Sequence, residues 1–215
     1  MTAEDRIARA HAHYERAVFA GETGVLTEAE RDLDGVEADL ALARGRILHA
    51  RFLDGRVEDP RELPLFERAV ELYRQLGDAR GEAEALFWVG CVHQVIRQDE
   101  KAAAPAYARA HQLATGVGDR LTLSYVLRHL AFTEQAAGRL DAARQRMEES
   151  TQLRREVGFQ PGVAANLVGL AFLAIGDGRR DDARALVEEA AATAEASGAS
   201  GILRWVEEAR QALSE

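Results

Sequence analysis

The stretch G-R-L-D-A-A-R-Q-R-M-E-E-S at residues 138–150 recurs 40 residues later as G-R-R-D-D-A-R-A-L-V-E-E-A at residues 178–190. Both copies begin with a glycine, which is followed by an alanine, then by a large apolar residue and then by a small residue at the same intervals. These positions are Gly138, Ala143, Met147 and Ser150 in the first copy and Gly178, Ala183, Val187 and Ala190 in the second. A sequence period of about 20–50 residues is typical of proteins that stack repeated units. The stretch therefore predicts a repeat architecture.

The same spacing extends over residues 82–197. Glycines, small residues and large apolar residues each recur in register. The matching sets are Gly118, Gly158 and Gly198; Ala103, Ala143 and Ala183; Cys91, Ala131 and Ala171; and Phe87, Leu127 and Leu167. Because three residue classes recur together, we interpret the period as a structural repeat.

Each period contains two runs with the 3.6-residue spacing of an amphipathic helix. The expected helices are 81–96, 99–115, 121–137, 140–157, 162–175 and 180–197. Glycines close most of these runs, as expected for residues that end a helix in the left-handed conformation. No run of β-branched residues bounded by turns indicates a strand, so the sequence predicts an all-α protein.

The two quoted stretches resemble the turn and second helix of a tetratricopeptide repeat. The resemblance extends from about Val36 to the C-terminus. The period of 40 exceeds the usual length of about 34, as in the extended repeats of bacterial regulators. The resemblance implies a right-handed superhelix of antiparallel helix pairs. Armadillo and HEAT repeats have a similar length but lack the glycine–alanine spacing, and they are the alternative.

We expect a single domain over residues 1–215. Its segments are an N-terminal helix or cap (1–26), a degenerate repeat (27–77), three clear repeats (78–118, 119–158 and 159–198) and a C-terminal capping helix (199–215). In the degenerate repeat, a capping box from Thr27 to Glu30 is expected to start a helix that ends near Leu53. Gly35 and Gly45 are candidate breaks in that helix.

Composition limits the classes of partner. A net charge of −9 and a pI near 5.3 argue against nucleic acid, because lysine and arginine supply much of the affinity for phosphates. A single cysteine excludes an intramolecular disulfide. No signal-type segment and no apolar run of about 18 residues is present. We therefore expect a cytoplasmic protein that binds neither nucleic acid nor membrane.

No catalytic or metal-binding motif is recognisable. Cys91 occupies a small-residue position of the repeat, which explains it without a nucleophilic role. His11 and His13 lie two residues apart on a helix and so point to different faces. The acidic group at residues 177–182 fits a turn followed by a helix N-terminus. We expect no cofactor, no metal and no catalytic residue.

The resemblance implies that the first helices of successive repeats line a concave groove. The groove residues expected from the register are Trp88, Val92, Tyr125, Arg128, His129, Phe132, Gln135 and Phe172. The leading hypothesis is a non-catalytic protein- or peptide-binding adaptor or scaffold, with a homodimer as a further expectation. The alternatives are a regulatory sensor of a peptide or small-molecule signal, and a tailoring enzyme with a site built around Tyr125, Arg128 and His129. The same residues could instead be buried between adjacent first helices.

Overall fold

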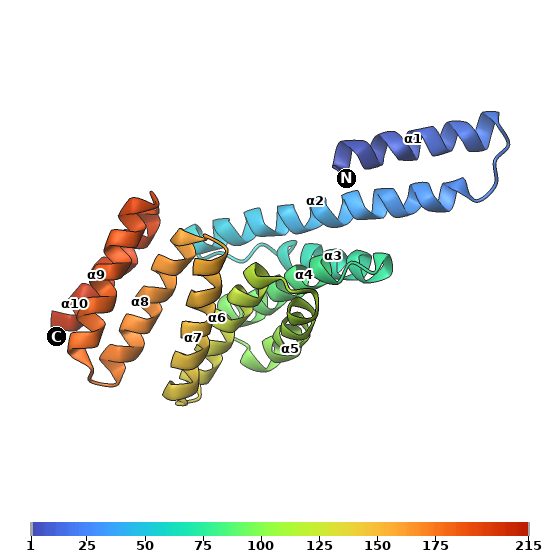
Figure 1. Ribbon diagram of the computed structural model, residues 1–215. Coiled ribbons are helices and arrows are strands. Elements are labelled where there is room, and N and C mark those ends of the chain that lie inside the picture. The colour runs from blue at the N-terminus through green and yellow to red at the C-terminus, as the bar shows by residue number, and fades with distance from the viewer. Residues whose placement is uncertain (1, 215) are drawn as a thin grey trace. The chain divides into compact units, whose positions relative to one another are not determined.

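The computed structural model describes residues 2–214, and every regular element in this part of the chain is helical (Figure 1). The elements are α1 (Ala3–Phe19), α2 (Val25–Gly55), α3 (Glu62–Leu76), α4 (Ala79–Cys91), the π-helix η1 (Val92–Ile96), α5 (Glu100–Val117), α6 (Arg120–Ala136), α7 (Leu140–Glu156), α8 (Gln160–Gly176), α9 (Arg180–Ala196) and α10 (Ser200–Ser214). The predicted all-α helical repeat is confirmed. Met1 and Glu215, the ends of the predicted terminal segments, lie outside the described residues.

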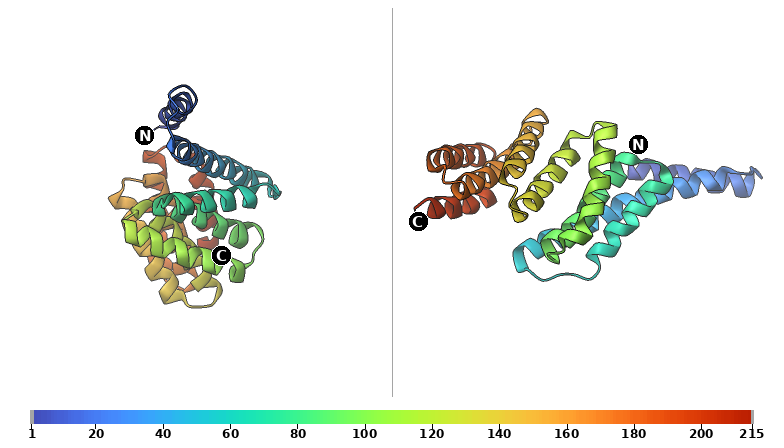
Figure 2. Two further views of the ribbon diagram at one scale, coloured as in Figure 1. Left: turned by 90° about the vertical axis from the view of Figure 1, so that its right-hand side faces the viewer. Right: turned by 90° about the horizontal axis from the view of Figure 1, so that it is seen from below.

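The chain divides into two compact units. The N-terminal unit ends at Val117 and contains α1 to α5, whereas the C-terminal unit begins at Gly118 and contains α6 to α10. Within each unit, consecutive helices pack against each other, so that each unit is a stack of helical hairpins (Figures 1 and 2). The division falls at a glycine where the sequence predicts a repeat boundary.

The predicted glycine helix ends are confirmed. Gly138, Gly158 and Gly178 have φ values of 75°, 74° and 72°, in the left-handed region. At the first of these turns, the backbone N–H of Arg139 donates to the carbonyl of Glu134 at 2.9 Å. This bond satisfies a carbonyl that the end of the helix would otherwise leave unpaired.

The turn between α4 and α5 differs from the later repeats. Gln98 stands where they have Gly138 and Gly178, and it adopts φ 54° without being a glycine. The sequence predicts one α-helix over 81–96, but its last turn, η1, is a π-helix. After this π-helical turn, the backbone N–H of Asp99 donates to the carbonyl of His93 at 2.8 Å.

The helix α2 is a single element of 31 residues. The proposed breaks at Gly35 and Gly45 are absent because both glycines serve close packing. A Cβ at Gly45 would lie 2.5 Å from the Phe66 ring, and one at Gly35 would lie 2.5 Å from the Arg6 guanidinium. Each glycine therefore lets another side chain cross the helix closely.

The start of α2 also differs from the expected capping box at Thr27. The helix begins two residues earlier, at Val25, whose side chain is buried. Gly24 precedes it with φ 85°. A capping box does form at the start of α1, where Thr2 and Asp5 exchange backbone–side-chain hydrogen bonds of 2.9 and 3.1 Å.

The small-residue positions of the repeat lie in the helix interfaces. Ala103, Ala143 and Ala183 have no exposed surface, and Ala131 and Ala171 have almost none. Small side chains allow the two helices of a pair to approach closely. α10 then packs on both α8 and α9, with Val206 and Ala209 buried.

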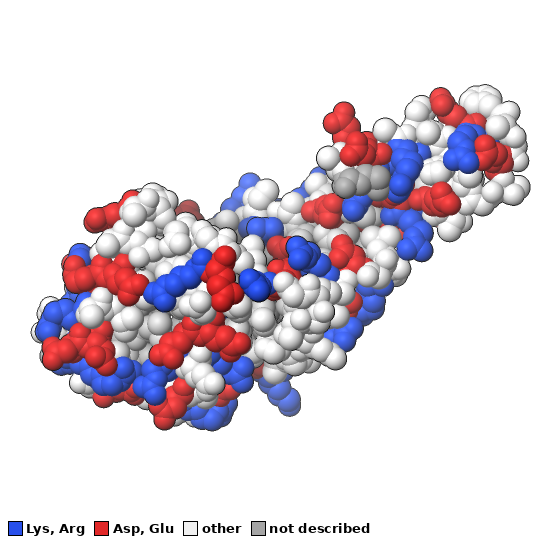
Figure 3. Space-filling model, in the orientation of Figure 1, with Lys and Arg blue, Asp and Glu red and all other residues white. Residues whose placement is uncertain are grey.

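Charges of both signs are interspersed over the surface in view in Figure 3. Many form ion pairs between neighbouring helices, such as Arg155 with Glu189 at 2.7 Å and Arg210 with Glu188 at 3.1 Å. Exposed pairs of this kind contribute little to stability individually. Among the helices described, none combines the length and the apolar character needed to cross a membrane.

Candidate functional site

Two of the predicted groove residues, Trp88 and Val92, lie in the N-terminal unit and pack inside it. Val92 is fully buried, so it lines no groove. Trp88 is half-buried, stacks on Phe66 with ring centroids 5.6 Å apart and forms a T-shaped contact with His49 at 5.1 Å. Its buried Nε1 has no acceptor among the described residues. Both positions therefore contribute mainly to the core of this unit.

The other six predicted residues lie in the C-terminal unit, and four of them share one cavity. We call this cavity, of about 340 Å³, the Trp205 pocket. It is lined by Arg128, Phe132 and Gln135 of α6, Val168, Gly169 and Phe172 of α8, and Trp205 and Glu208 of α10. The α6 residues occur at i, i+4 and i+7, which places them on one face of the helix.

The remaining two predicted residues, Tyr125 and His129, are half-buried beside the pocket rather than in its lining. The guanidinium of Arg154 lies 4.8 Å from the centre of the Tyr125 ring. The His129 and Phe132 rings form a T-shaped contact with their centroids 5.5 Å apart. Both rings therefore support the residues around them, and His129 helps to fix the Phe132 side chain.

Behind the pocket lies a set of buried polar contacts centred on Asn166. Nη1 of Arg128 donates to Oδ1 of Asn166 at 2.7 Å and to the carbonyl of Ala165 at 2.9 Å. Nη1 of Arg154 donates to the same Oδ1 at 2.8 Å and to the carbonyl of Gly162 at 2.8 Å. The Asn166 amide group donates to Oγ of Ser150 at 2.8 Å. One asparagine thus holds two guanidinium groups, and we call this set the asparagine network.

No carboxylate pairs with either guanidinium among the described residues. Burial lowers the pKa of Arg154 to about 10. Burial, together with the nearby charge of Arg154, lowers the pKa of Arg128 to about 9. Both groups therefore stay protonated at neutral pH. Neutral acceptors and the faces of aromatic rings stabilise their charges, and the Arg128 guanidinium lies 4.9 Å from the centre of the Phe132 ring.

Arg128 also faces the pocket. Its hydrogen bonds to the described residues all use Nη1, and none of its other nitrogens is a buried atom without a partner. Nε and Nη2 bond to no group of the described residues, so they remain accessible at the pocket. An oxygen acceptor in the pocket would find a fixed, charged donor beside three aromatic rings.

Sequence reasoning missed Arg154, Asn166 and Trp205 as parts of this site. The repeat did carry a signal for the first two. Arg154 stands in register with Ala114 and Ala194, and Asn166 stands in register with Leu86 and Val126. A polar residue in an otherwise apolar position marks a local departure from the repeat. Trp205 lies outside the period, on the predicted C-terminal capping helix, and it is half-buried.

The other candidates for chemistry have structural explanations. Cys91 is buried, and desolvation raises the pKa of its thiol, which disfavours the reactive thiolate. Asp177 and Asp182 both pair with Arg179, at 3.1 and 2.9 Å. No group of three or more potential metal ligands occurs in the part of the chain that the structure describes.

Comparison with known proteins gives one family match, to the tetratricopeptide repeat, over residues 119–196. A solved structure, "Crystal structure of BtubC (BKLC) from P. vanneervenii", matches over 92% of this chain and 93% of that chain, with 15% sequence identity and a TM-score of 0.46. A search of curated proteins gives no match. The family match covers α6 to α9, the two helix pairs that contain the quoted stretches. Residues 119–196 therefore belong to the tetratricopeptide repeat family.

Proposed function

We propose that the C-terminal unit is a non-catalytic protein- or peptide-binding module whose Trp205 pocket holds one large apolar side chain of the partner. The observation that carries this proposal is the shared pocket of Phe132, Phe172 and Trp205 beside Arg128. Repeats of this family generally mediate protein–protein interactions. Aromatic residues and arginine are also the residue types that most often dominate binding energy at interfaces.

The geometry supports a division of roles. The aromatic rings supply the apolar contact area, and a cavity of about 340 Å³ matches one or two side chains rather than a large cofactor. Arg128 would then bond a carbonyl or carboxylate oxygen of the partner next to its anchor residue. Because the asparagine network fixes the Arg128 side chain, this bond would set the register of the partner at little cost in side-chain entropy.

A displayed peptide library tests the proposal without knowledge of the natural partner. Peptides selected on the wild-type protein should contain an aromatic or large aliphatic residue that is required for binding. The variants Phe132→Ala and Phe172→Ala should each weaken a selected peptide by about 2 kcal/mol, as for other hot-spot residues. Titration calorimetry with the synthetic peptide measures this loss.

Val157→Ala is the matched control, because Val157 is an exposed apolar residue of the same unit that does not line the pocket. It should leave the affinity unchanged, and circular dichroism should show all variants folded. Equal affinity of the wild-type protein and of the Phe132→Ala/Phe172→Ala double variant would contradict the proposal.

A further inference from the structure

The helix α2 exposes a row of large apolar side chains at intervals of seven residues. Leu26, Leu33, Leu40 and Ile47 are 50, 46, 47 and 56% exposed. Residues seven apart lie on one face of a helix. We call this row the α2 stripe. A sustained row of this kind on a long helix is typical of a surface that packs against another helix.

Charged residues separate the members of the α2 stripe in a definite order. Glu30 and Glu37 lie in the first half of the helix, and Arg44 and Arg51 lie in the second half, each four residues after a stripe member. The stripe is thus flanked by acidic side chains at one end and by basic side chains at the other. Glu37 also pairs with Arg68 of α3 at 2.7 Å.

The neighbouring helices of the N-terminal unit leave the α2 stripe uncovered. α1 and α3 are the helices that pack most extensively on α2. α3 meets the buried side of α2, where His49 bonds Glu62 at 2.8 Å, and reaches the stripe only at its edge, where Arg68 pairs with Glu37. Exposed apolar residues gather in this part of the chain more than elsewhere. Ten of the fourteen large exposed apolar side chains among the described residues lie before α3: Ile7, Tyr14, Val18, Phe19, Leu26, Leu33, Leu40, Ile47, Leu53 and Val57.

We propose that the α2 stripe is a self-association surface on which α2 of a second copy of this chain packs in the antiparallel direction. A two-fold axis near residue 40 places Leu40 against Leu40 of the second copy. Because the residue numbers of facing positions then sum to about 80, Leu33 meets Ile47. The charges match in the same register, since Glu37 meets Arg44 and Glu30 meets Arg51. One symmetry operation therefore pairs apolar with apolar side chains and acidic with basic ones.

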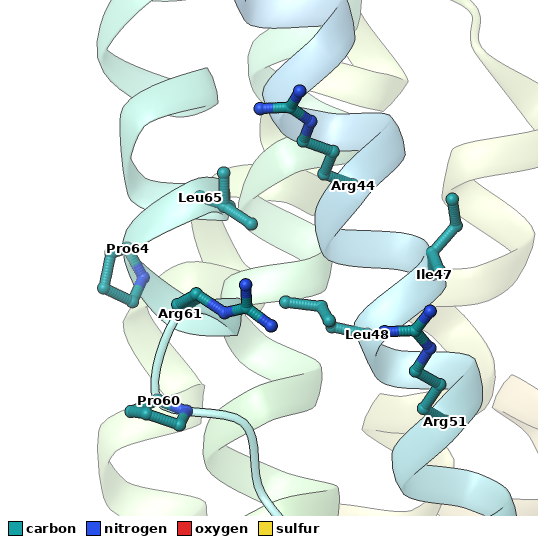
Figure 4. Close-up of a pocket in the computed structure, with 8 residues that line it drawn as sticks. All are labelled: Arg44, Ile47, Leu48, Arg51, Pro60, Arg61, Pro64 and Leu65. Carbon is teal, nitrogen blue, oxygen red and sulfur yellow. The ribbon is translucent and has the colours of Figure 1, made fainter.

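A cavity at the basic end of the α2 stripe supports this register. The cavity has a volume of about 590 Å³ and lies between α2 and the start of α3 (Figure 4). It is lined by Arg44, Ile47, Leu48, Arg51, Pro60, Arg61, Pro64 and Leu65. In the antiparallel register, Leu33 of the second copy faces Ile47 at the edge of this cavity. Its side chain would enter the apolar part of the cavity between the arginines.

Charge complementarity argues for a second copy as the occupant. Arg61 pairs with Asp59 at 2.7 Å. Arg44 and Arg51 form no ion pair with an acidic side chain among the described residues, although the charge of Arg51 helps to lower the pKa of the nearby Asp59. A partner helix must therefore offer acidic side chains here and basic side chains towards Leu26. The helix α2 itself carries that order of charges, and an isologous two-fold contact uses the same patch twice.

The first experiment measures the oligomeric state of the full chain by sedimentation velocity over a range of concentrations. The wild-type protein should be a dimer. The variant Leu33→Glu/Leu40→Glu should dimerise at least about 100-fold more weakly, because it would bury unpaired carboxylates at the contact. Val57→Glu is the control, since Val57 is 75% exposed in the same unit but lies outside α2. A monomeric wild-type protein, or a dimer that persists in the double variant with native circular dichroism, overturns the proposal.

A charge exchange tests the direction of packing with variants that keep the apolar contact. Glu30→Arg and Arg51→Glu are suitable because neither residue forms an ion pair within its own chain among the described residues. Each variant alone should dimerise about tenfold more weakly, since like charges then face each other twice. A mixture of the two should form a heterodimer of near wild-type affinity, because every facing pair is again complementary. Failure of the mixture to recover affinity overturns the antiparallel register.

Disulfide trapping in a Cys91→Ala background separates the antiparallel arrangement from a parallel one. Leu40→Cys should cross-link to itself on oxidation. Leu33→Cys should cross-link poorly to itself but readily to Ile47→Cys in a mixture. Efficient self-cross-linking of Leu33→Cys would indicate parallel helices and would overturn the proposal.

Discussion

At the scale of single residues, Gln98 carries a conformational cost that the later repeats avoid. Its φ of 54° is left-handed, and Gly138 and Gly178 fill the same position elsewhere. A residue with a Cβ in this conformation costs about 1–2 kcal/mol. We therefore expect Gln98→Gly to raise the free energy of unfolding by about 1 kcal/mol after the greater entropy of glycine in the unfolded chain is counted. Chemical denaturation measures the change.

Gln112→Gly is the control for that prediction. Gln112 is exposed within α5, where glycine should lower the stability by about 1 kcal/mol. Equal effects of the two substitutions would show that the backbone conformation of Gln98 has no influence on stability.

Asn166 should be among the most sensitive residues of the C-terminal unit. It is fully buried, and its Oδ1 accepts from both Arg128 and Arg154. Asn166→Leu removes an acceptor from two charged donors at once, and we expect a loss of about 3 kcal/mol. Asn166→Asp keeps the acceptor and should lose much less. Urea unfolding of both variants measures the difference, and similar losses would argue against the network as the cause.

The lowered pKa of Arg128 predicts a dependence of stability on pH. In the folded protein the pKa is about 9, compared with an ordinary value of 12.5. Between these values the unfolded chain binds more protons, so the folded state gains stability as the pH rises above 9. The unfolding free energy of the wild type, taken relative to that of Arg128→Met, should therefore rise by about 1 kcal/mol from pH 7 to pH 10. An unchanged gap would contradict the lowered pKa.

At the scale of elements, the small residues at helix interfaces set how closely α6 and α7 approach. Ala131 and Ala143 are 1 and 0% exposed. Ala131→Leu or Ala143→Leu should destabilise the protein by about 1–3 kcal/mol through overpacking. Ala136→Leu, at an exposed position of α6, should have little effect. Thermal unfolding compares the three, and wild-type melting of either core variant would rule out this close packing.

The repeat predicts helices well because glycines and interface alanines recur in register. The bounds of α7 and α9 differ from the expected ones by a single residue at the C-terminal end. Errors occur where a residue serves tertiary packing instead of local propensity. Gly45 looks like a break in sequence but accommodates the Phe66 ring. The π-helical turn η1 occurs in the repeat where Gln98 replaces the glycine, and the apolar periodicity of the sequence does not reveal it.

The candidate site is predictable only in part, for a similar reason. Phe132 and Phe172 occupy equivalent register positions on first helices, and Arg128 lies one helical turn before Phe132, so their common face follows from the repeat. Trp205 completes the pocket from α10, which has no counterpart in the period. The acceptors of Arg128 also depend on side-chain packing across three helices. Residue spacing along one helix contains no information about either contact.

At the scale of the whole molecule, the two units differ in the surfaces that they expose. Apolar exposure is concentrated before α3 in the N-terminal unit, whereas the Trp205 pocket lies in the C-terminal unit. Self-association and partner binding, as proposed, therefore use separate parts of the chain. Variants of the α2 stripe should leave peptide affinity per subunit unchanged, so each proposal can fail without the other.

Because α10 contributes Trp205 to the pocket, the docking of this helix is coupled to ligand binding. The helix packs on α8 and α9, and folded proteins open locally in units smaller than the whole domain. A ligand of the pocket binds only molecules in which α10 is docked, so its apparent dissociation constant rises as the docked fraction falls. By the same equilibrium, a bound ligand slows amide hydrogen exchange throughout α10, including residues far from the contact. The rate of hydrogen exchange in α10 thus measures the fraction of protein with a ligand in the Trp205 pocket.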